Sequence, residues 1–443
     1  MKSIIKKLII TFFTITVILI YISDFSFKTK KFSFTKIKKI LPKDLIVFLQ
    51  TFSLNFIDYN YPIVTEKIFE LEDRNVKFKK FSSSFFKPRG YLEQDNQNIY
   101  FINNNGILFY FSKNEIIENK KVKFKKIKTN LDSLIGKNYI QDVVTVVKDI
   151  LIIDNKVFVS YVNNLNGCYS NGFLNGVLNV DEIIFSPFLI IEECKKRLGN
   201  SVGGNLKKFK DNKIVVTIGD YESYEFVGDG DPQNINSLYG KIITVDLDTK
   251  KIDILSSGHR NPQGLFYDSK NDILFSTEHG PQGGDEINVN VSPNFNKIKN
   301  YGWAISSYGE HYGYDVGWSD KIKKETNLID DLYKVAPLNK SHKNFGFEEP
   351  IKYFTPSIGI TEILKVKNNN SNNHKLLVSS MGWVPKEDIM TLHIIDFDNN
   401  FFQKNHEKIY VDDRIRDIID LKNGQIIMSL DTSGSIALLS NVY

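Results

Sequence analysis

Four polar side chains with the potential for acid–base, anion-binding or metal chemistry lie within residues 258–303. Arg260, His279, Asp285 and Glu286 supply a cation, a possible acid or base, and two hard oxygen ligands. Elsewhere the chain is rich in Lys, Asn, Ile and Phe, whereas this segment gathers Gly, Pro, His, Arg and acidic residues. Arginine can pair with a carboxylate through two parallel hydrogen bonds, and carboxylates bind hard cations. The segment therefore predicts a site for an anionic cofactor and a metal ion, with a structural salt bridge as the alternative role for Arg260.

The backbone of the same segment is also suited to binding a ligand. Gly280, Gly283 and Gly284 allow conformations that other residues avoid, and they let a ligand approach the chain closely. Pro281 fixes its own φ angle. Exposed carbonyl groups of Gly280 and Pro281 could bind calcium, which prefers oxygen ligands.

Two further arginines form a second candidate group near the C-terminus. Arg414 and Arg416 are two residues apart in a segment that begins a late pair of strands. In a strand this spacing places both side chains on one face, so both could point toward a common site. The alternative is an exposed strand edge that its charges protect against aggregation.

The sequence pattern around these residues predicts an all-β fold. From about residue 95, apolar strands alternate with polar turns whose Asn, Asp and Gly residues are typical of hairpins. The first four turns are about 50–60 residues apart, a spacing that suits four-stranded propeller blades. Six turns predict a six-bladed β-propeller, with 301–349 as a long inserted loop; two packed β-sandwich domains are the alternative. The turns lie at residues 103–106, 154–156, 211–213, 270–272, 368–372 and 422–424.

The N-terminus differs from the body of the chain. Residues 1–23 contain three early lysines followed by a 16-residue apolar run from Leu8 to Ser23, which predicts a signal peptide or a membrane-anchor helix. A buried core helix is the alternative. Residues 24–50 read as a basic linker, and residues 51–443 as the propeller. We therefore expect an exported, periplasmic protein that its N-terminal segment tethers to the membrane, or a secreted protein if that segment is cleaved.

The charge distribution argues against nucleic acid as a partner, and the cysteine content bears on whether the chain forms a disulfide. Residues 1–45 carry ten lysines and two aspartates, a net charge of +8 against +5 for the whole chain, so the remaining residues sum to −3. The basic excess therefore belongs to the N-terminus, and the body is not expected to bind nucleic acid. Cys168 and Cys194 are the two cysteines. In an oxidising compartment they could close one disulfide across a loop, or they could remain two unpaired thiols.

The motifs in order resemble a known family. The run GHRNPQGLFYD, STEHGPQGGDEIN and NYGW in residues 258–303 resembles the glucose/sorbosone dehydrogenases, which are soluble sugar dehydrogenases. Shorter matches extend the resemblance over roughly residues 200–435; they lie at 217–220, 237–242, 356–358 and 414–417. The resemblance implies a six-bladed propeller that uses pyrroloquinoline quinone (PQQ) and calcium to oxidise an aldose.

The resemblance also implies roles for the two arginine groups. Arg260 and Asn261 match the pair that contacts the quinone. Arg414 and Arg416 match arginines that bind the carboxylates of the cofactor.

The resemblance also implies roles for the loop after His279. His279 itself stands where family members have Gln or His. Gly280 and Pro281 match the positions whose carbonyls hold the cofactor calcium, and Asp285 matches an acidic position of the same loop. Glu286 with Tyr301 resembles a separate, structural calcium site.

Two departures from the family pattern concern catalysis. The general-base histidine and a nearby arginine should lie in residues 200–205, but that stretch contains neither, and no histidine precedes His259. Gly382 stands where a lysine should contact the cofactor. His279 and Asp285 are then the nearest candidates for the base.

The expected function is therefore a PQQ-dependent oxidoreductase that acts on a sugar hydroxyl, with an unspecified electron acceptor. The alternative is a catalytically inactive propeller that binds glycans or envelope proteins. A propeller hydrolase such as a lactonase is a third possibility, but it leaves the arginines unexplained.

Overall fold

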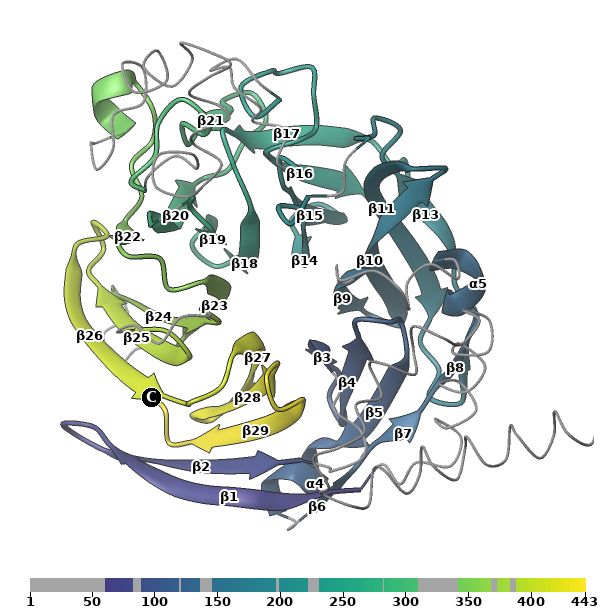
Figure 1. Ribbon diagram of the computed structural model, residues 1–443, viewed down its shortest axis with the longest axis vertical. Helices are drawn as coiled ribbons and strands as arrows, with labels where there is room; N and C mark the ends of the chain where they lie inside the picture. Colours follow the sequence, from purple (N-terminus) through teal and green to yellow (C-terminus); the bar gives the residue numbers. More distant parts are fainter. Residues whose placement is uncertain are drawn as a thin grey trace, which may run out of the picture.

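The computed structural model describes residues 60–443, apart from residues 83–88, 119–120, 136–145, 197–198, 222–230, 282, 310–341, 368–372 and 383–387. Six β-sheets stand around a central axis (Figure 1). This arrangement confirms the predicted six-bladed propeller and rules out the two packed sandwiches. The expected helix of residues 1–23 and the linker of residues 24–50 lie outside the described residues. Within the described part of the chain, no helix is long and apolar enough to cross a membrane.

Blades are numbered here along the chain, and each runs from an innermost to an outermost strand. Blade 1 contains β3 (Gly90–Gln94), β4 (Asn98–Asn103), β5 (Leu108–Ser112) and β7 (Lys125–Lys126). Blade 2 contains β9 (Val147–Ile153), β10 (Lys156–Leu165), β11 (Cys168–Val177) and β13 (Ser186–Ile190). Blade 3 contains β14 (Gly203–Phe209), β15 (Lys213–Ile218), β16 (Lys241–Asp246) and β17 (Ile252–Ser257), with β21 (Lys299–Asn300) at its edge.

The second half of the ring follows the same order. Blade 4 contains β18 (Pro262–Asp268), β19 (Ile273–Glu278), β20 (Asp285–Val291) and β22 (Lys352–Phe354). Blade 5 contains β23 (Ile360–Val366), β24 (His374–Ser380), β25 (Thr391–Phe397) and β26 (Gln403–Tyr410). Blade 6 contains β27 (Ile415–Lys422), β28 (Gln425–Leu430) and β29 (Ser435–Ser440), and it is completed by β2 (Asn75–Phe81), β1 (Asn60–Glu70) and β6 (Lys121–Lys123).

Short elements fill the outside of the ring. A two-stranded parallel sheet joins β8 (Lys128–Thr129) to β12 (Glu182–Ile183). Among the described residues, the helices are α4 (Lys113–Glu118), α5 (Leu131–Ile135) and the 3-10 helix η2 (His342–Phe345). Helix η2 follows the undescribed part of the predicted 301–349 loop.

Most of the predicted turns join the first two strands of a blade. This holds for the turns at 154–156, 211–213, 270–272 and 422–424, whereas the turn at 103–106 joins β4 to β5. Asp154, Asp211, Asp272 and Asn423 have φ angles of 51–57°, the left-handed region that Asn and Asp tolerate better than most residues. The turn at 368–372 lies outside the described residues.

The ring is closed by strands from opposite ends of the chain. In blade 6, β2 pairs antiparallel with β29, from Lys77 opposite Ser440 to Phe81 opposite Ile436 (Figure 1). The outermost positions of this blade therefore come from the N-terminal part of the propeller. Residues about 360 positions apart in sequence share one sheet.

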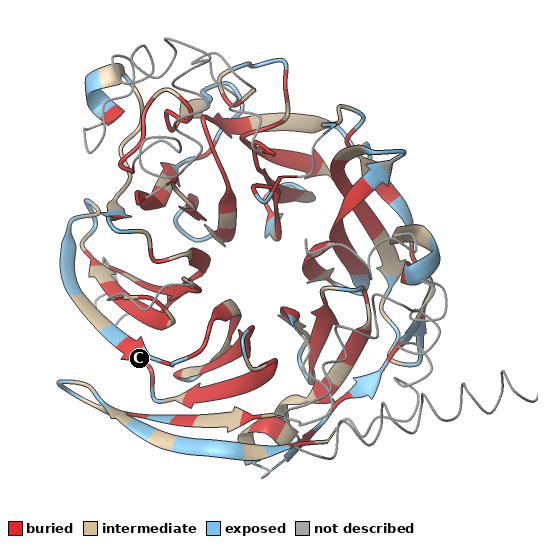
Figure 2. Ribbon diagram, in the orientation of Figure 1, coloured by how far each residue is buried: buried red, intermediate tan, exposed pale blue. Residues whose placement is uncertain are grey.

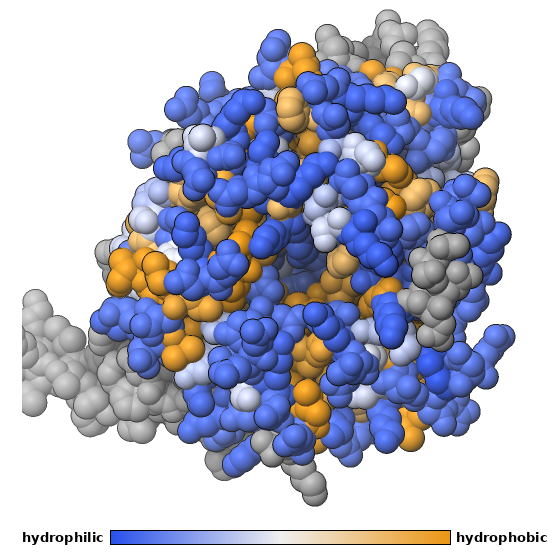
Figure 3. Space-filling model, turned by 180° about the vertical axis from the view of Figure 1, so that it is seen from behind, coloured by the Kyte–Doolittle hydropathy of each residue, from blue (hydrophilic) through white to orange (hydrophobic). Residues whose placement is uncertain are grey.

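The hydrophobic core lies between the faces of neighbouring blades. One cluster joins blades 5 and 6 through residues such as Leu377, Ile394 and Met428, and another joins blades 2 and 3. Buried residues fill the inner and middle strands, whereas exposed residues follow β1 and β26 at the rim (Figure 2). Seen from the opposite side, the surface is hollowed near the middle of the ring (Figure 3).

Buried carboxylates connect the innermost strands to one another. Asp149 on β9 accepts a hydrogen bond from the Leu206 N–H on β14 at 2.7 Å, and Asp417 on β27 accepts one from the Leu92 N–H on β3 at 2.6 Å. Each such bond satisfies a backbone donor that has no ladder partner across the gap between blades. The same pattern recurs at Glu93, which accepts from Ile152, and at Glu362, which accepts from Leu265. These contacts tie the innermost strands of neighbouring blades to one another.

Candidate functional site

The two halves of the 258–303 segment meet at the start of blade 4. Arg260 and Asn261 directly precede β18, and the N–H of His279, just after β19, donates to the Asn261 carbonyl at 3.1 Å. The Arg260 guanidinium donates through Nη1 to the carbonyls of His279, at 3.1 Å, and Gly280, at 3.0 Å. It also lies 5.8 Å from the Trp303 ring. The predicted cofactor pair and the predicted calcium ligand are therefore in direct contact.

Asn261 also contacts the stretch from which the family's base would come. Its Oδ1 accepts a hydrogen bond from the Gly203 N–H at 3.2 Å and another from the Gln263 amide at 2.7 Å. Ser201 and Asn205 occupy the flanking positions, and both are buried. The structure thus places residues 200–205 beside the cofactor pair, where they supply no histidine.

Asp285 acts mainly as a structural clamp. Its carboxylate is fully buried and accepts three backbone hydrogen bonds of 3.0 Å, from Gly280, Ile358 and Ile360. Although burial raises its pKa, the nearby His279 ring and the backbone donors hold that pKa below the usual value for aspartate. We therefore regard Asp285 as a poor proton acceptor. It fastens the 280–285 loop to the start of β23.

His279 remains the better candidate for acid–base chemistry at this rim. Its side chain is 22% exposed, and its Nδ1 lies 3.8 Å from the Asp285 carboxylate. A carboxylate at this position can orient the ring.

Arg414 and Arg416 lie at the start of β27, on the innermost strand of blade 6. Arg416 pairs with Asp431 through Nη2 at 2.9 Å and Nε at 3.3 Å, and its side chain is 13% exposed. Burial, together with the charges of Arg416 and Arg89, lowers the pKa of Arg414 to about 10, although Asp431 opposes the shift. Both arginines are inside the ring, so the alternative of an exposed strand edge is wrong.

A pair of buried glutamates forms a second cluster behind the Arg260 rim. Glu278 on β19 and Glu286 on β20 face each other in the strand ladder. His259 Nδ1 lies 2.7 Å from Glu278, and His342 Nε2 lies 3.0 Å from Glu286. Tyr301, the other predicted ligand of the structural calcium, directs its hydroxyl to the Val289 carbonyl.

This cluster borders a small pocket. The pocket lies between the Arg260–Gly280 rim and the segment from Tyr301 to Ser307, and His342 closes one side. Burial raises the pKa of Glu286. Burial opposes a rise in the pKa of His342, but the hydrogen bond and charge of Glu286 outweigh it and raise that pKa above the ordinary value.

The sequence hypotheses missed four residues in and beside this cluster. Glu278 and His259 lie inside the 258–303 segment, but nothing in their spacing showed that they pair. Ser256 hydrogen bonds to His259 Nε2 at 2.8 Å, which gives the connectivity of a Ser–His–acid triad. Because Ser256 and His259 are at most 1% exposed, we regard the triad as structural. His342 lies beyond the inserted loop, where no sequence pattern marked it.

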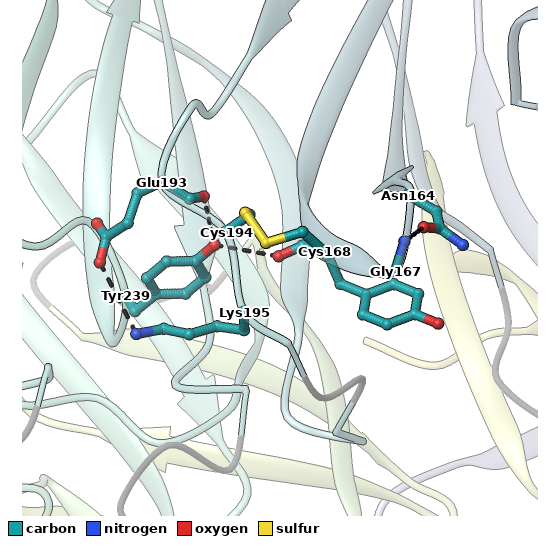
Figure 4. The surroundings of a disulfide bond; sticks show 8 residues. Asn164, Gly167, Cys168, Glu193, Cys194, Lys195 and Tyr239 are labelled. Carbon is teal, nitrogen blue, oxygen red and sulfur yellow. Dashed lines mark hydrogen bonds and ion pairs between the residues drawn. A yellow bond between two sulfur atoms is a disulfide. The ribbon is translucent and has the colours of Figure 1, made fainter.

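The disulfide supports the neighbouring wall of the ring. Cys168 and Cys194 are bonded, with their Cα atoms 5.4 Å apart, so the first of the two sequence alternatives is confirmed. Figure 4 shows the Tyr239 hydroxyl directed at the Glu193 carbonyl next to this bond, at 2.6 Å. Glu193 also accepts the Ser237 hydroxyl through its carboxylate. The disulfide thus joins the β10–β11 hairpin to the loop that leads into β14.

Comparison with known proteins supports the family resemblance. The sequence model of the glucose/sorbosone dehydrogenases matches residues 153–438, well over half of the chain. The chain belongs to the glucose/sorbosone dehydrogenase family. This family member shares 30% identity over 131 residues with the aldose sugar dehydrogenase YliI of Escherichia coli, and 36% over 107 residues with the quinoprotein glucose dehydrogenase B of Acinetobacter calcoaceticus.

Those matches cover 27% and 22% of this chain, and they span only 33% and 21% of the two relatives. Among solved structures, the apo-form aldose sugar dehydrogenase of Escherichia coli is similar with a TM-score of 0.59 and 19% identity. That similarity covers 82% of this chain and 98% of the other. At this level of identity the structural likeness supports the fold alone.

Proposed function

We propose that this chain binds PQQ with calcium and oxidises a hydroxyl group of an aldose. The observation that carries the proposal is the contact of Arg260 and Asn261 with the 279–285 loop at the start of β18. Residues that the family resemblance assigns to the cofactor come together there from separate parts of the sequence. Arg414 and Arg416 stand at the start of another inner strand of the same ring.

The charges suit an anionic cofactor. Asp431 already neutralises Arg416, whereas the lowered pKa of Arg414 reflects burial beside other positive groups. A bound carboxylate would stabilise the charged form of Arg414. A quinone that carries carboxylates is a ligand of this kind.

The calcium that would accompany the quinone would bind at the 279–285 loop. The Gly280 carbonyl already faces a positive group, the Arg260 guanidinium. Gly280 and Pro281 would hold the ion through their carbonyl oxygens. When bound, calcium and quinone together supply the hydride acceptor, with the ion polarising the quinone.

The protein's own residues would bind the cofactor and accept a proton. Arg260 and Asn261 would bind and orient the cofactor, and the Trp303 ring lines the adjoining pocket. His279 is the partly exposed titratable side chain at this rim, so we assign to its ring the role of accepting the proton of the sugar hydroxyl.

The test uses the full chain in detergent, loaded with calcium and PQQ and assayed with a panel of aldoses and an artificial electron acceptor. We expect quinone binding and turnover, and we expect His279→Gln to keep the binding while lowering turnover roughly 10²–10⁴-fold. Failure to bind the quinone would refute the cofactor site. Binding without turnover of any sugar would refute the enzyme and leave the alternative below.

The alternative is a non-catalytic propeller that binds glycans or envelope proteins. Two observations favour it. Ser201 and Asn205 replace the expected base and its neighbouring arginine. At Gly382, an added Cβ would lie 2.6 Å from Ile389 and 2.9 Å from the Ile358 carbonyl, so this position has no room for the cofactor-contacting lysine. In this case the panel should show binding of a glycan or an envelope protein without oxidation.

We also propose that the protein is exported and held at the membrane by residues 1–23. The disulfide supports export because such bonds persist mainly in oxidising compartments. Cell fractionation with a thiol-reactive label provides the test. Recovery in the cytoplasmic fraction, with Cys168 and Cys194 both labelled, would contradict the proposal.

A further inference from the structure

The Glu278–Glu286 cluster concentrates negative charge in the interior. The two residues are 5% and 6% exposed, and they are direct partners in the β19–β20 ladder. Buried carboxylates require a cation or several hydrogen-bond donors, because leaving water is otherwise too costly. The sequence hypothesis assigned a structural calcium ion to this place, with Glu286 and Tyr301 as ligands.

The contacts of Glu286 do not suit that ion. Oε1 lies 3.0 Å from His342 Nε2, and Oε2 accepts a hydrogen bond from the Asn288 amide at 3.2 Å. Calcium takes six to eight oxygen ligands at about 2.3–2.6 Å, whereas both oxygens of Glu286 here face nitrogen. Within the described ranges, no group of three His, Cys, Asp or Glu side chains is placed to hold a metal ion.

The partner glutamate is satisfied in the same way. Glu278 Oε2 lies 2.7 Å from His259 Nδ1, and Oε1 accepts the backbone N–H of Arg260. Each of the facing glutamates therefore has its own histidine. The two pairs thus provide nitrogen partners for both carboxylates without an ion.

His342 is held in this position by packing. Its side chain is 1% exposed, and its ring lies 4.8 Å from that of Tyr308. Gly302 leaves room for the ring: an added Cβ there would lie 2.7 Å from His342 Nδ1, and the residue has a φ of 90°. A side chain at 302 would push the imidazole away from Glu286.

We propose that the imidazole of His342 takes the place of a metal ion at Glu286, so that this part of the ring is held together without calcium. The proposal is independent of the cofactor calcium at Gly280 and Pro281, and it does not require that the protein oxidise sugars. It predicts that the wild-type fold is insensitive to calcium at Glu286. It also predicts that removal of the imidazole creates a cation site there.

The experiment compares the quinone-free full chain with its Glu286→Gln variant, using calcium and terbium as probes. Terbium bound near Trp303 should emit when tryptophan is excited. For the wild type we expect no terbium emission that Glu286→Gln abolishes, and no calcium-dependent change in Tm that Glu286→Gln abolishes. A calcium-induced rise in Tm of about 3 °C or more that disappears in Glu286→Gln would overturn the proposal.

The second comparison uses His342→Ala. Calcium should raise the Tm of this variant by about 3 °C or more, and its terbium emission should exceed that of the wild type. His374→Ala removes another buried histidine, far along the chain in blade 5, and should lower Tm without a calcium response. A folded His342→Ala protein whose Tm does not change with calcium would also refute the proposal. If that variant does not fold, the comparison of the wild type with Glu286→Gln decides alone.

Discussion

Arg260 donates a hydrogen bond to the carbonyl of Gly280, at 3.0 Å, across twenty residues of sequence. The contact joins the residue assigned to the quinone to the residue assigned to its calcium. The guanidinium therefore lies on the side of the carbonyl that a cation would favour. The same arginine is then well placed to respond when an anionic ligand arrives.

Arg260→Ala should weaken PQQ binding roughly 10- to 100-fold, the usual effect of losing one charge-assisted hydrogen-bonding partner. Quinone titration followed by absorbance measures the change. The matched control is Arg74→Ala, which removes an arginine paired with Glu407 at 2.8 Å on the outer part of blade 6. The control should bind quinone normally; equal binding by both variants would remove Arg260 from the cofactor site.

Asp285→Asn should destabilise the fold by roughly 2–3 kcal/mol, because an amide cannot accept all three backbone hydrogen bonds and its own N–H groups would face other donors. Urea denaturation measures the loss. Asp132→Asn, at an exposed position that accepts only its neighbour's N–H, is the control. A stability equal to that of the wild type would show that the clamp on the 280–285 loop is dispensable.

The paired histidines of blade 5 should make stability fall in mild acid. His393 Nδ1 lies 2.9 Å from His406 Nε2, and burial lowers their pKa values to about 4 and about 3. Above pH 6.5 both the folded and the unfolded chain carry these rings neutral. Between about pH 6.5 and pH 4 only the unfolded chain takes up protons, so folding loses about 2 kcal/mol at pH 5 from the fully buried His393.

The measurement is the free energy of unfolding at pH 7.5 and pH 5 for the wild type and for His393→Gln. The comparison between variants is needed because Asp149, whose pKa is raised to about 7 chiefly by burial, shifts stability in the opposite direction. The variant should lose less stability on acidification than the wild type. An equal loss of unfolding free energy in the two proteins between pH 7.5 and pH 5 would mean that the histidine pair titrates normally in the folded chain.

Loss of the Cys168–Cys194 bond should cost roughly 3 kcal/mol, as expected for a cross-link that closes a loop of 26 residues. The double variant Cys168→Ser/Cys194→Ser should have a lower Tm than the wild type. A reducing agent should lower the Tm of the wild type by a similar amount and leave the double variant unchanged. A wild type that does not respond to the reductant would contradict the bond's contribution.

Local chemistry explains how much of this architecture could be predicted. Turn residues such as Asp154 and Asp272 adopt left-handed backbone conformations that few other residues tolerate, so they marked the blades from sequence. The central segment was recognisable because Arg260, Gly280 and Pro281 are unusual beside the surrounding Lys- and Asn-rich strands. Both the turn residues and the central segment can be recognised from residues that are close together in sequence.

The remaining features depend on contacts between distant residues. His342 contacts Glu286 across 56 positions of sequence, and no local sequence pattern near either residue predicts this contact. The clamp made by Asp285 joins β20 to the start of β23, so an acidic residue that could have been a base turned out to be an anchor. Such roles emerge only when the blades are placed beside each other.

The pairing of β2 with β29 has a consequence for how the chain matures. Strand β2 ends at Phe81, but β29, its partner on one side, is complete only at Ser440. An emerging chain must therefore carry β2, paired only with β1, through almost the whole of translation. At about 5–20 residues per second this interval lasts roughly 20–70 s. Throughout that time β2 presents an open backbone edge, and chaperone protection of residues 75–81 would be most valuable during this interval.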